Sequence, residues 1–300
     1  GSGLVGSEMC IRDSICGGYN GKTTRLAETW EYDIDNDWWT QRADMPGTVR
    51  NAATGFSVGS KGYVTTGYNP DQKYLSDTWE YNPETNSWRQ MDDFKGGARY
   101  YAIGFGIDNY GYVGTGYNDN YLKDFYRFDP TATAGSQWTI VNGFGGQKRQ
   151  GGTAFVIDGK AYVCGGQNNN SDVSDFWCFD PSAATPWTQL RDIANTSDDD
   201  YDDDYTSIVR SYGVSFVIDG KAYLTLGSTA GGSYYSNYWI YDPATDLWEG
   251  DDLTAFEGST RIHAVCFSTG TRGIVATGGS GSSSYFDDTW ELKPYEYEEE

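Results

Sequence analysis

Apolar and polar residues alternate in short runs along most of the chain, with a period of two. In residues 211–226 (SYGVSFVIDGKAYLTL) two such runs flank Asp219-Gly220, a pair favoured in two-residue hairpin turns. A polar loop follows, and then an aromatic run such as TWEYNPETNSW (78–88), whose Asn-Pro centre predicts a turn between two more strands. The pattern predicts units of four short antiparallel strands, here called A to D. No stretch shows a helix-length apolar period of 3.6.

The unit recurs six times. Strand B ends each time at an anchoring glycine, and the steps between these glycines are 49, 49, 50, 61 and 51 residues. The anchoring glycines are Gly18, Gly67, Gly116, Gly166, Gly227 and Gly278. An arginine stands 17 residues before each of the last five, and an aromatic residue follows each glycine after 10–12 positions. Six four-stranded units of about 50 residues predict an all-β, six-bladed β-propeller with four-stranded antiparallel blades.

This pattern resembles the kelch repeat: arginine at the head of strand A, a glycine pair ending strand B, an aromatic residue in strand C and tryptophan in strand D. The resemblance runs from about Ser14 to Pro294, although Thr66, Thr115, Leu226 and Thr277 replace the first glycine of the pair. Residues 98–118 are especially similar to bacterial secreted or surface kelch proteins of the galactose-oxidase-like group. The resemblance implies one propeller domain over residues 14–300 and an extracellular or cell-surface location.

Both ends of the chain depart from the repeat. Residues 1–13 include GSGLVGSEM, which does not match strand A of the other units, so we treat them as a separate N-terminal segment. Strand D of the sixth blade is due where the chain reads YEYEEE. We expect this outer strand to come from residues 295–300 or, preferably, from residues upstream of Gly1.

Composition narrows the functional classes. The chain has 21 Lys+Arg against 43 Asp+Glu, a net charge of −22, which argues against nucleic-acid binding because a phosphate backbone needs a basic footprint. No apolar run approaches the roughly 20 residues that cross a bilayer. Five scattered cysteines without CxxC spacing are neither a disulfide framework nor a zinc ribbon. The single histidine, His263, excludes the two-histidine copper site of galactose oxidases.

Loop chemistry indicates where a ligand would bind. The B–C and D–A loops share one end of the propeller and vary in length, as ligand-carrying loops on a rigid scaffold do. They are rich in tyrosines, which offer a flat apolar face with a polar tip, and in amides. This mixture suits a glycan or a polar peptide, although the same residues could simply build turns. The B–C candidates are Tyr19, Tyr68, Tyr117, Asn118, Gln167, Tyr234 and Tyr235, and the same loops continue through Tyr74, Asn120, Tyr121, Asn169 and Tyr285.

The repeated arginines admit two interpretations. They head strand A on the same face, so they could ring the channel and bind a carboxylate, as arginines near this loop do in kelch substrate adaptors. Their regularity favours the alternative, a structural element that bonds to backbone of a neighbouring segment. These residues are Arg50, Arg99, Arg149, Arg210 and Arg261, and His263 follows the last of them by two positions.

An insertion of about ten residues lies between blades 4 and 5. Alternate carboxylates at Asp200, Asp202 and Asp204 are a possible Ca²⁺ site, since Ca²⁺ takes hard oxygen ligands. The EF-hand pattern fails, and runs of like charge are usually solvated and mobile. We expect no other cofactor.

The sequence therefore predicts a non-enzymatic binding module whose B–C and D–A loops bind a glycan or polar peptide. Two alternatives stay open. Six-bladed kelch sialic-acid mutarotases work without a metal, so the resemblance also permits a sugar mutarotase or epimerase in which the arginines bind a carboxylate and His263 moves a proton. The third possibility is a protein-interaction adaptor, although no helical partner domain accompanies the repeats.

Overall fold

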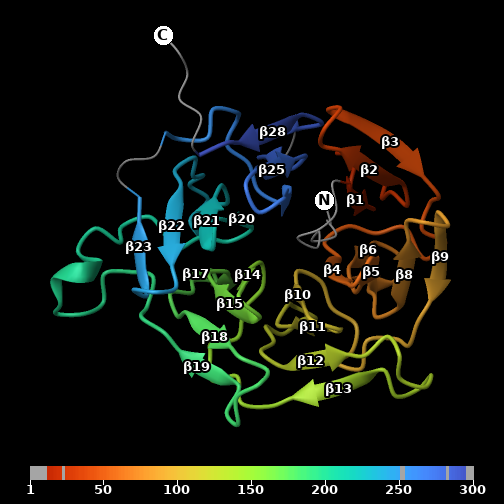
Figure 1. Cartoon of the computed structure of the whole chain (residues 1–300), viewed down its shortest axis with the longest axis horizontal. Helices are drawn as coiled ribbons and strands as arrows, with labels where there is room; N and C mark the ends of the chain where they lie inside the picture. Colours follow the sequence, from red (N-terminus) through yellow and green to blue (C-terminus); the bar gives the residue numbers. More distant parts are fainter. Residues whose placement is uncertain (1–11, 22–23, 251–253, 282–283, 295–300) are drawn as a thin grey trace.

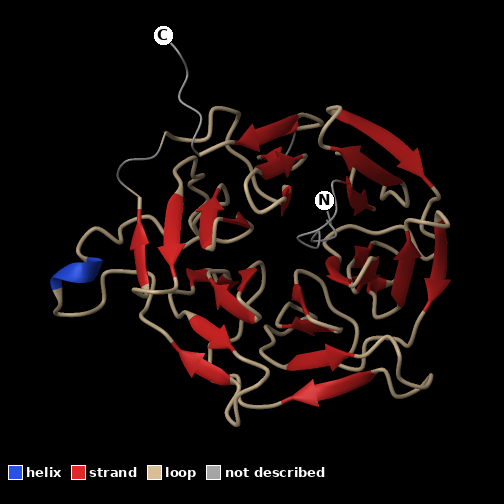
Figure 2. Cartoon of the chain, in the orientation of Figure 1, coloured by secondary structure: helices blue, strands red, loops and turns tan. Residues whose placement is uncertain are grey.

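The computed structural model describes residues 12–21, 24–250, 254–281 and 284–294. Six antiparallel sheets lie around a central axis, with strand A innermost and strand D outermost (Figure 1). This arrangement confirms the predicted six-bladed propeller. Almost all regular structure is strand (Figure 2), and the only helical element among the described residues is one 3-10 turn, η1 (Asp200–Asp202).

Blades 2 to 5 contain all four strands in the order A-B-C-D. Their bounds are, for blade 2, β4 (Thr54–Val58), β5 (Lys61–Thr65), β8 (Thr78–Asn82) and β9 (Ser87–Gln90); for blade 3, β10 (Ile103–Ile107), β11 (Tyr110–Gly114), β12 (Phe125–Phe128) and β13 (Trp138–Val141); for blade 4, β14 (Thr153–Ile157), β15 (Lys160–Cys164), β18 (Trp177–Phe179) and β19 (Trp187–Gln189); and for blade 5, β20 (Val214–Ile218), β21 (Lys221–Thr225), β22 (Trp239–Asp242) and β23 (Leu247–Glu249).

Blades 1 and 6 each show three strands within the described residues. Blade 1 has strands B to D, which are β1 (Arg12–Cys16), β2 (Thr29–Asp33) and β3 (Trp38–Arg42). Blade 6 has strands A to C, which are β24 (Val265–Ser268), β25 (Gly273–Ala276) and β28 (Thr289–Leu292). Strand A of blade 1 and strand D of blade 6 would fall on residues 1–11 and 295–300, outside the described residues. Strand β1 begins at Arg12, inside the segment that the sequence set apart.

The ring closes between blades 6 and 1. The indole Nε1 of Trp39 donates a hydrogen bond to the hydroxyl of Thr289 at 2.9 Å, and Tyr32 packs against Phe267 with ring centroids 5.8 Å apart. These contacts join residues about 250 positions apart in the chain. The two terminal blades therefore pack against each other as neighbouring blades do elsewhere in the ring.

Aromatic side chains form the core between blades. Phe56 and Tyr63 of blade 2 pack on Phe128 and Trp138 of blade 3, and all four are buried. Burial of a large ring contributes roughly 2–3 kcal/mol, which explains why a chain of short sheets carries so many rings. A Cβ at Gly111 would lie 2.1 Å from the Phe56 ring, so this glycine allows the close approach of blades 2 and 3.

Three further two-stranded ladders lie in the B–C loops. They are β6 (Tyr68–Asn69) with β7 (Lys73–Tyr74), β16 (Gln167–Asn168) with β17 (Ser171–Asp172), and β26 (Gly279–Ser280) with β27 (Ser284–Tyr285). The loops that carry the candidate ligand residues are therefore small hairpins, held by backbone hydrogen bonds.

Candidate functional site

The repeated arginines form a buried frame inside the blades. Arg50 is fully buried; its guanidinium donates to the carbonyl of Thr66 at 3.0 Å and to the carboxylate of Asp77 at 2.8 Å. The same pattern recurs in every other blade that has this arginine. The carboxylate partners are Asp77, Asp124, Asp175 and Asp288, and in blade 5 the side-chain oxygen of Asn237 replaces the carboxylate.

The same frame links consecutive blades. The N–H of Gly67 donates to the carbonyl of Arg99 in the next blade at 2.8 Å, and four of the other anchoring glycines make the equivalent bond. Gly116 has φ +93°, and a Cβ there would lie 2.8 Å from the carbonyl oxygen of Tyr100. Side chains of Arg50, Arg99, Arg149, Arg210 and Arg261 are at most 1% exposed. Burial and pairing favour the structural interpretation, in which these arginines belong to the scaffold, over the ligand-binding one.

Residues two positions after each arginine turn toward the axis. Tyr101, Tyr212 and His263 all have positive φ, between 52° and 59°. The ring of Tyr101 stacks on His263 at 4.9 Å and 9°, and Tyr212 packs on both. These residues belong to blades 3, 5 and 6, and blades 3 and 6 are opposite each other, so the stack crosses the centre of the ring. We call these three residues the axial stack.

Hydrogen bonds fix the axial stack. The amides of Gln150 and Gln167 donate to the hydroxyl of Tyr212 at 2.8 and 2.6 Å, and the Tyr101 hydroxyl lies 3.3 Å from His263 Nε2. Burial lowers the pKa of His263 to about 3 and raises the pKa of Tyr101 above its ordinary value. At neutral pH the imidazole is therefore uncharged and the phenol protonated.

A cluster of tyrosines covers the loops of blades 2 and 3. Tyr74 stacks on Tyr100 with centroids 5.6 Å apart and planes 8° apart, and Tyr100 also contacts Tyr68, Tyr117 and the axial Tyr101. The Tyr74 hydroxyl donates to the Asp119 carboxylate at 2.8 Å, which ties the loop of blade 2 to that of blade 3. We call Tyr68, Tyr74, Tyr100, Tyr117 and Tyr121 the tyrosine cluster.

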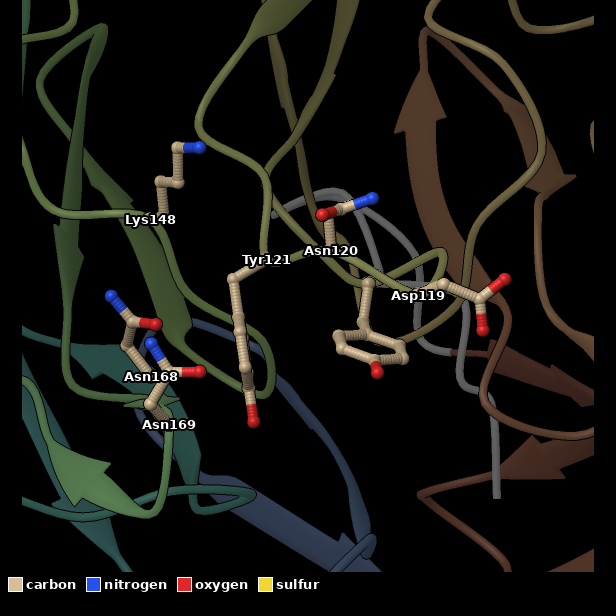
Figure 3. Close-up of a pocket in the computed structure, with 7 residues that line it drawn as sticks. Asp119, Asn120, Tyr121, Lys148, Asn168 and Asn169 are labelled. Carbon is tan, nitrogen blue, oxygen red and sulfur yellow. The ribbon is translucent and has the colours of Figure 1, made fainter.

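A polar pocket of about 240 Å³ opens where this cluster meets blade 4. Figure 3 shows the Tyr121 ring standing between Asp119 and Asn120 on one side and Asn168 and Asn169 on the other. Its lining residues are Tyr117, Asp119, Asn120, Tyr121, Lys148, Asn168 and Asn169. Ring faces, amides and one ammonium group therefore line a single concavity.

The remaining candidate tyrosines and amides lie elsewhere on the loops. Tyr19 packs edge-on against Tyr285 at 5.7 Å, and Tyr234 accepts a hydrogen bond from the N–H of Gly281 at 2.8 Å. Tyr235 lies against the buried guanidinium of Arg210 at 4.7 Å, so its ring supports the scaffold. Asn118 closes the B–C turn of blade 3, its N–H donating to the carbonyl of Asn120.

The acidic insertion is folded onto blade 5. Asp202 is buried, and its carboxylate accepts hydrogen bonds at 2.9 Å from the N–H groups of Thr196 and Ser197. Tyr205 and Ile208 are also buried, within the core beside blade 5. This carboxylate therefore caps the loop from inside and does not line up with Asp200 and Asp204. Calcium binding at the loop stays a prediction.

Sequence reasoning missed the residues that join the site together. Tyr100, Tyr101 and Tyr212 stand one or two positions after a repeated arginine, and this fixed offset is the signal that could have found them. Lys148 and Arg25 carried no repeat signal, since the equivalent positions of other units differ.

Comparisons with known proteins agree with this architecture. The family model described as Kelch motif matches residues 50–95 and 148–190. A solved structure entitled "Structure of YjhT" is similar to the chain, with a TM-score of 0.76, 16% sequence identity and coverage of 96% of this chain and 93% of that one. No curated protein matches the sequence. None of the described helical residues forms a segment long and apolar enough to span a membrane. The chain is therefore a six-bladed β-propeller that carries the Kelch motif in blades 2 and 4.

Proposed function

We propose that this protein is a binding module that recognises a glycan through the tyrosine cluster and the adjoining polar pocket. Kelch propellers are in general interaction modules. The observation that carries the glycan assignment is the composition of the pocket, where the ring of Tyr121 lies beside Asn120, Asn168 and Asn169. Sugar rings stack on such faces through their axial hydrogens, and their hydroxyls pair with amide groups. The proposed setting is extracellular or at a cell surface, as the sequence resemblance implies.

The rigidity of the loops supports this assignment. The rings of the cluster contact one another across two blades, and short backbone ladders hold the loops beneath them. Binding to a preformed surface costs less conformational entropy than binding that must first order the loops.

A glycan array on the intact protein tests the proposal, followed by calorimetry with the sugars that bind. Tyr121→Ala removes the central ring of the pocket and is expected to weaken binding at least tenfold. Trp38→Ala is the matched control, because Trp38 is 58% exposed on the outer strand of blade 1. Binding that survives Tyr121→Ala contradicts the assigned site. A silent array together with a captured protein partner supports the adaptor function instead.

A second function is favoured by one observation, the contact between Tyr101 and His263. In mutarotation a base takes the proton of the anomeric hydroxyl while an acid protonates the ring oxygen, and the imidazole and phenol are groups of these two kinds, although the lowered pKa of His263 makes it a weak base. Proton NMR of a freshly dissolved anomer tests it, since an active protein accelerates approach to the anomeric equilibrium. A rate equal to that of buffer removes this function.

A further inference from the structure

Arg25, Arg127 and Arg191 each lie over a tyrosine ring and have no carboxylate partner among the described residues, and of the three Arg25 alone lies in a B–C loop, that of blade 1. The lysines on the opposite end of the propeller pair with acidic side chains: Lys61 with Glu80, Lys160 with Asp180 and Lys221 with Asp242. The contacts of Arg25 in the described part of the chain are with Asn51, Tyr19 and Tyr68 and include no carboxylate, although the chain carries a net charge of −22. A half-buried arginine on the loop face that has no carboxylate partner among the described residues can pair with an acidic group of a ligand.

Three contacts hold the Arg25 side chain in place. Its Nε donates to the side-chain oxygen of Asn51 at 2.9 Å. The guanidinium carbon lies 4.2 Å from the centroid of the Tyr19 ring and 5.7 Å from that of Tyr68. Cation–π contacts and one hydrogen bond therefore fix the plane of the group. Both terminal nitrogens are left without a hydrogen-bond partner in the described part of the chain.

The position of Arg25 connects it to the proposed binding surface. Tyr68 is a member of the tyrosine cluster, which extends through Tyr74 and Tyr117 toward the pocket. The positive charge of Arg25 also acts on the phenol of the axial Tyr101, where it opposes the rise in pKa caused by burial. The Arg25 guanidinium thus lies at one end of a row of contacting tyrosine rings, and the polar pocket lies at the other end.

We propose that Arg25 binds the carboxylate of an acidic sugar, a hexuronic acid residue within a glycan. This inference rests on the proposed glycan-binding function and specifies the class of ligand. The two terminal N–H groups of a fixed guanidinium match the two oxygens of a carboxylate in shape and charge. Tyr68 and Tyr74 supply the ring faces on which the pyranose stacks. A carboxylate bound there meets a cation on a chain whose net charge is −22, so the contact distinguishes the acid from an uncharged analogue.

The test uses trigalacturonic acid and its fully methyl-esterified form, in which each charged carboxylate is replaced by an uncharged methyl ester. Calorimetry at low salt is expected to show that the wild-type protein binds the acid about tenfold more tightly than the ester, since hydrogen bonds to charged groups are the stronger ones. Arg25→Gln is expected to abolish this difference and to leave ester binding within about twofold. Arg25→Lys keeps the charge without the planar fork and is expected to fall between the two.

Lys160→Gln is the matched control, because it removes one positive charge at the other end of the propeller. The role of Arg25 is overturned if the wild-type protein binds acid and ester equally. It is also overturned if Lys160→Gln loses the preference for the acid as Arg25→Gln does. In both cases glycan binding itself stands. Failure of both probes and of the whole glycan array overturns the proposed function itself. If Arg25→Gln has the melting temperature of the wild type, its loss of affinity comes from the missing contact and not from a less stable fold.

Discussion

Blade 5 lacks the carboxylate that faces the buried arginine in the other blades that have this arginine. Arg210 is 1% exposed and pairs with the side-chain oxygen of Asn237 at 3.0 Å and with main-chain carbonyls. Burial lowers the pKa of Arg210 from 12.5 to about 10. At about 1.4 kcal/mol per pKa unit, this corresponds to roughly 3 kcal/mol of unfavourable free energy for the charged side chain. The change Asn237→Asp supplies the missing negative charge.

The expected gain is smaller than this figure, for two reasons. The new carboxylate must itself be desolvated, and burial lowers the pKa of Arg149 even though Asp175 faces it. We therefore expect Asn237→Asp to raise the free energy of unfolding by about 1–2 kcal/mol, which is roughly 2–4 °C in Tm for a chain of this size. Ser207 can accommodate the change, because its hydroxyl now accepts from Asn237 Nδ2 and can rotate to donate to a carboxylate.

Thermal unfolding at pH 7 measures this effect. Asp77→Asn makes the reverse change in blade 2 and is expected to cost roughly 2 kcal/mol, since it leaves Arg50 buried without its counter-ion. Asn142→Asp is the control, because it adds the same charge at an exposed position. The gain from Asn237→Asp requires an ionised carboxylate, so it should vanish as the pH falls below about 4. Suppose that Asp77→Asn lowers the free energy of unfolding but Asn237→Asp does not raise it. That result would refute the idea that Arg210 lacks charge compensation.

Three further changes test other parts of the scaffold. Gly116→Ala is expected to cost about 2 kcal/mol more than Gly135→Ala in urea unfolding, since both have φ near +90° but only the first meets backbone; equal costs would show that φ alone matters. His263→Phe is expected to lessen the loss of stability between about pH 6.5 and 3, because in that window the unfolded state binds the proton that the buried imidazole refuses; an unchanged pH profile contradicts this. Trp39→Phe removes the closing hydrogen bond to Thr289 and should lower stability by about 1 kcal/mol, so an unchanged Tm would show that packing alone closes the ring.

The repeat made most of the architecture predictable. Fixed offsets from Gly67, Gly116 and their equivalents specify strand order, because strand A, strand B and the hairpin between them are local in sequence. The hairpin turn at Asp219-Gly220 has positive φ at both residues, as the dipeptide predicts. Cysteine chemistry was also predictable in part: the four described cysteines are free, and Cys16 and Cys164 are buried.

The role of the arginines required the structure. Five arginines at the same position of five units could either surround the channel and bind a ligand or form a buried frame. The deciding fact is the carboxylate at the start of strand C, such as Asp77, which lies 27 residues beyond Arg50 in sequence and 2.8 Å away in space. An aspartate stands at this place in four units, so the repeat itself contains the partner of the arginine.

The sequence by itself determined the number of blades, the strand pattern and the end of the ring on which variable loops gather, because these follow from local periodicity and from chain connectivity. Only the tertiary structure decided which side chains meet across the ring. Tyr101 and His263 are 162 residues apart and touch because blade closure brings opposite blades to one axis. Arg25 is half-buried and Arg50 fully buried, because burial depends on neighbours that no single repeat contains.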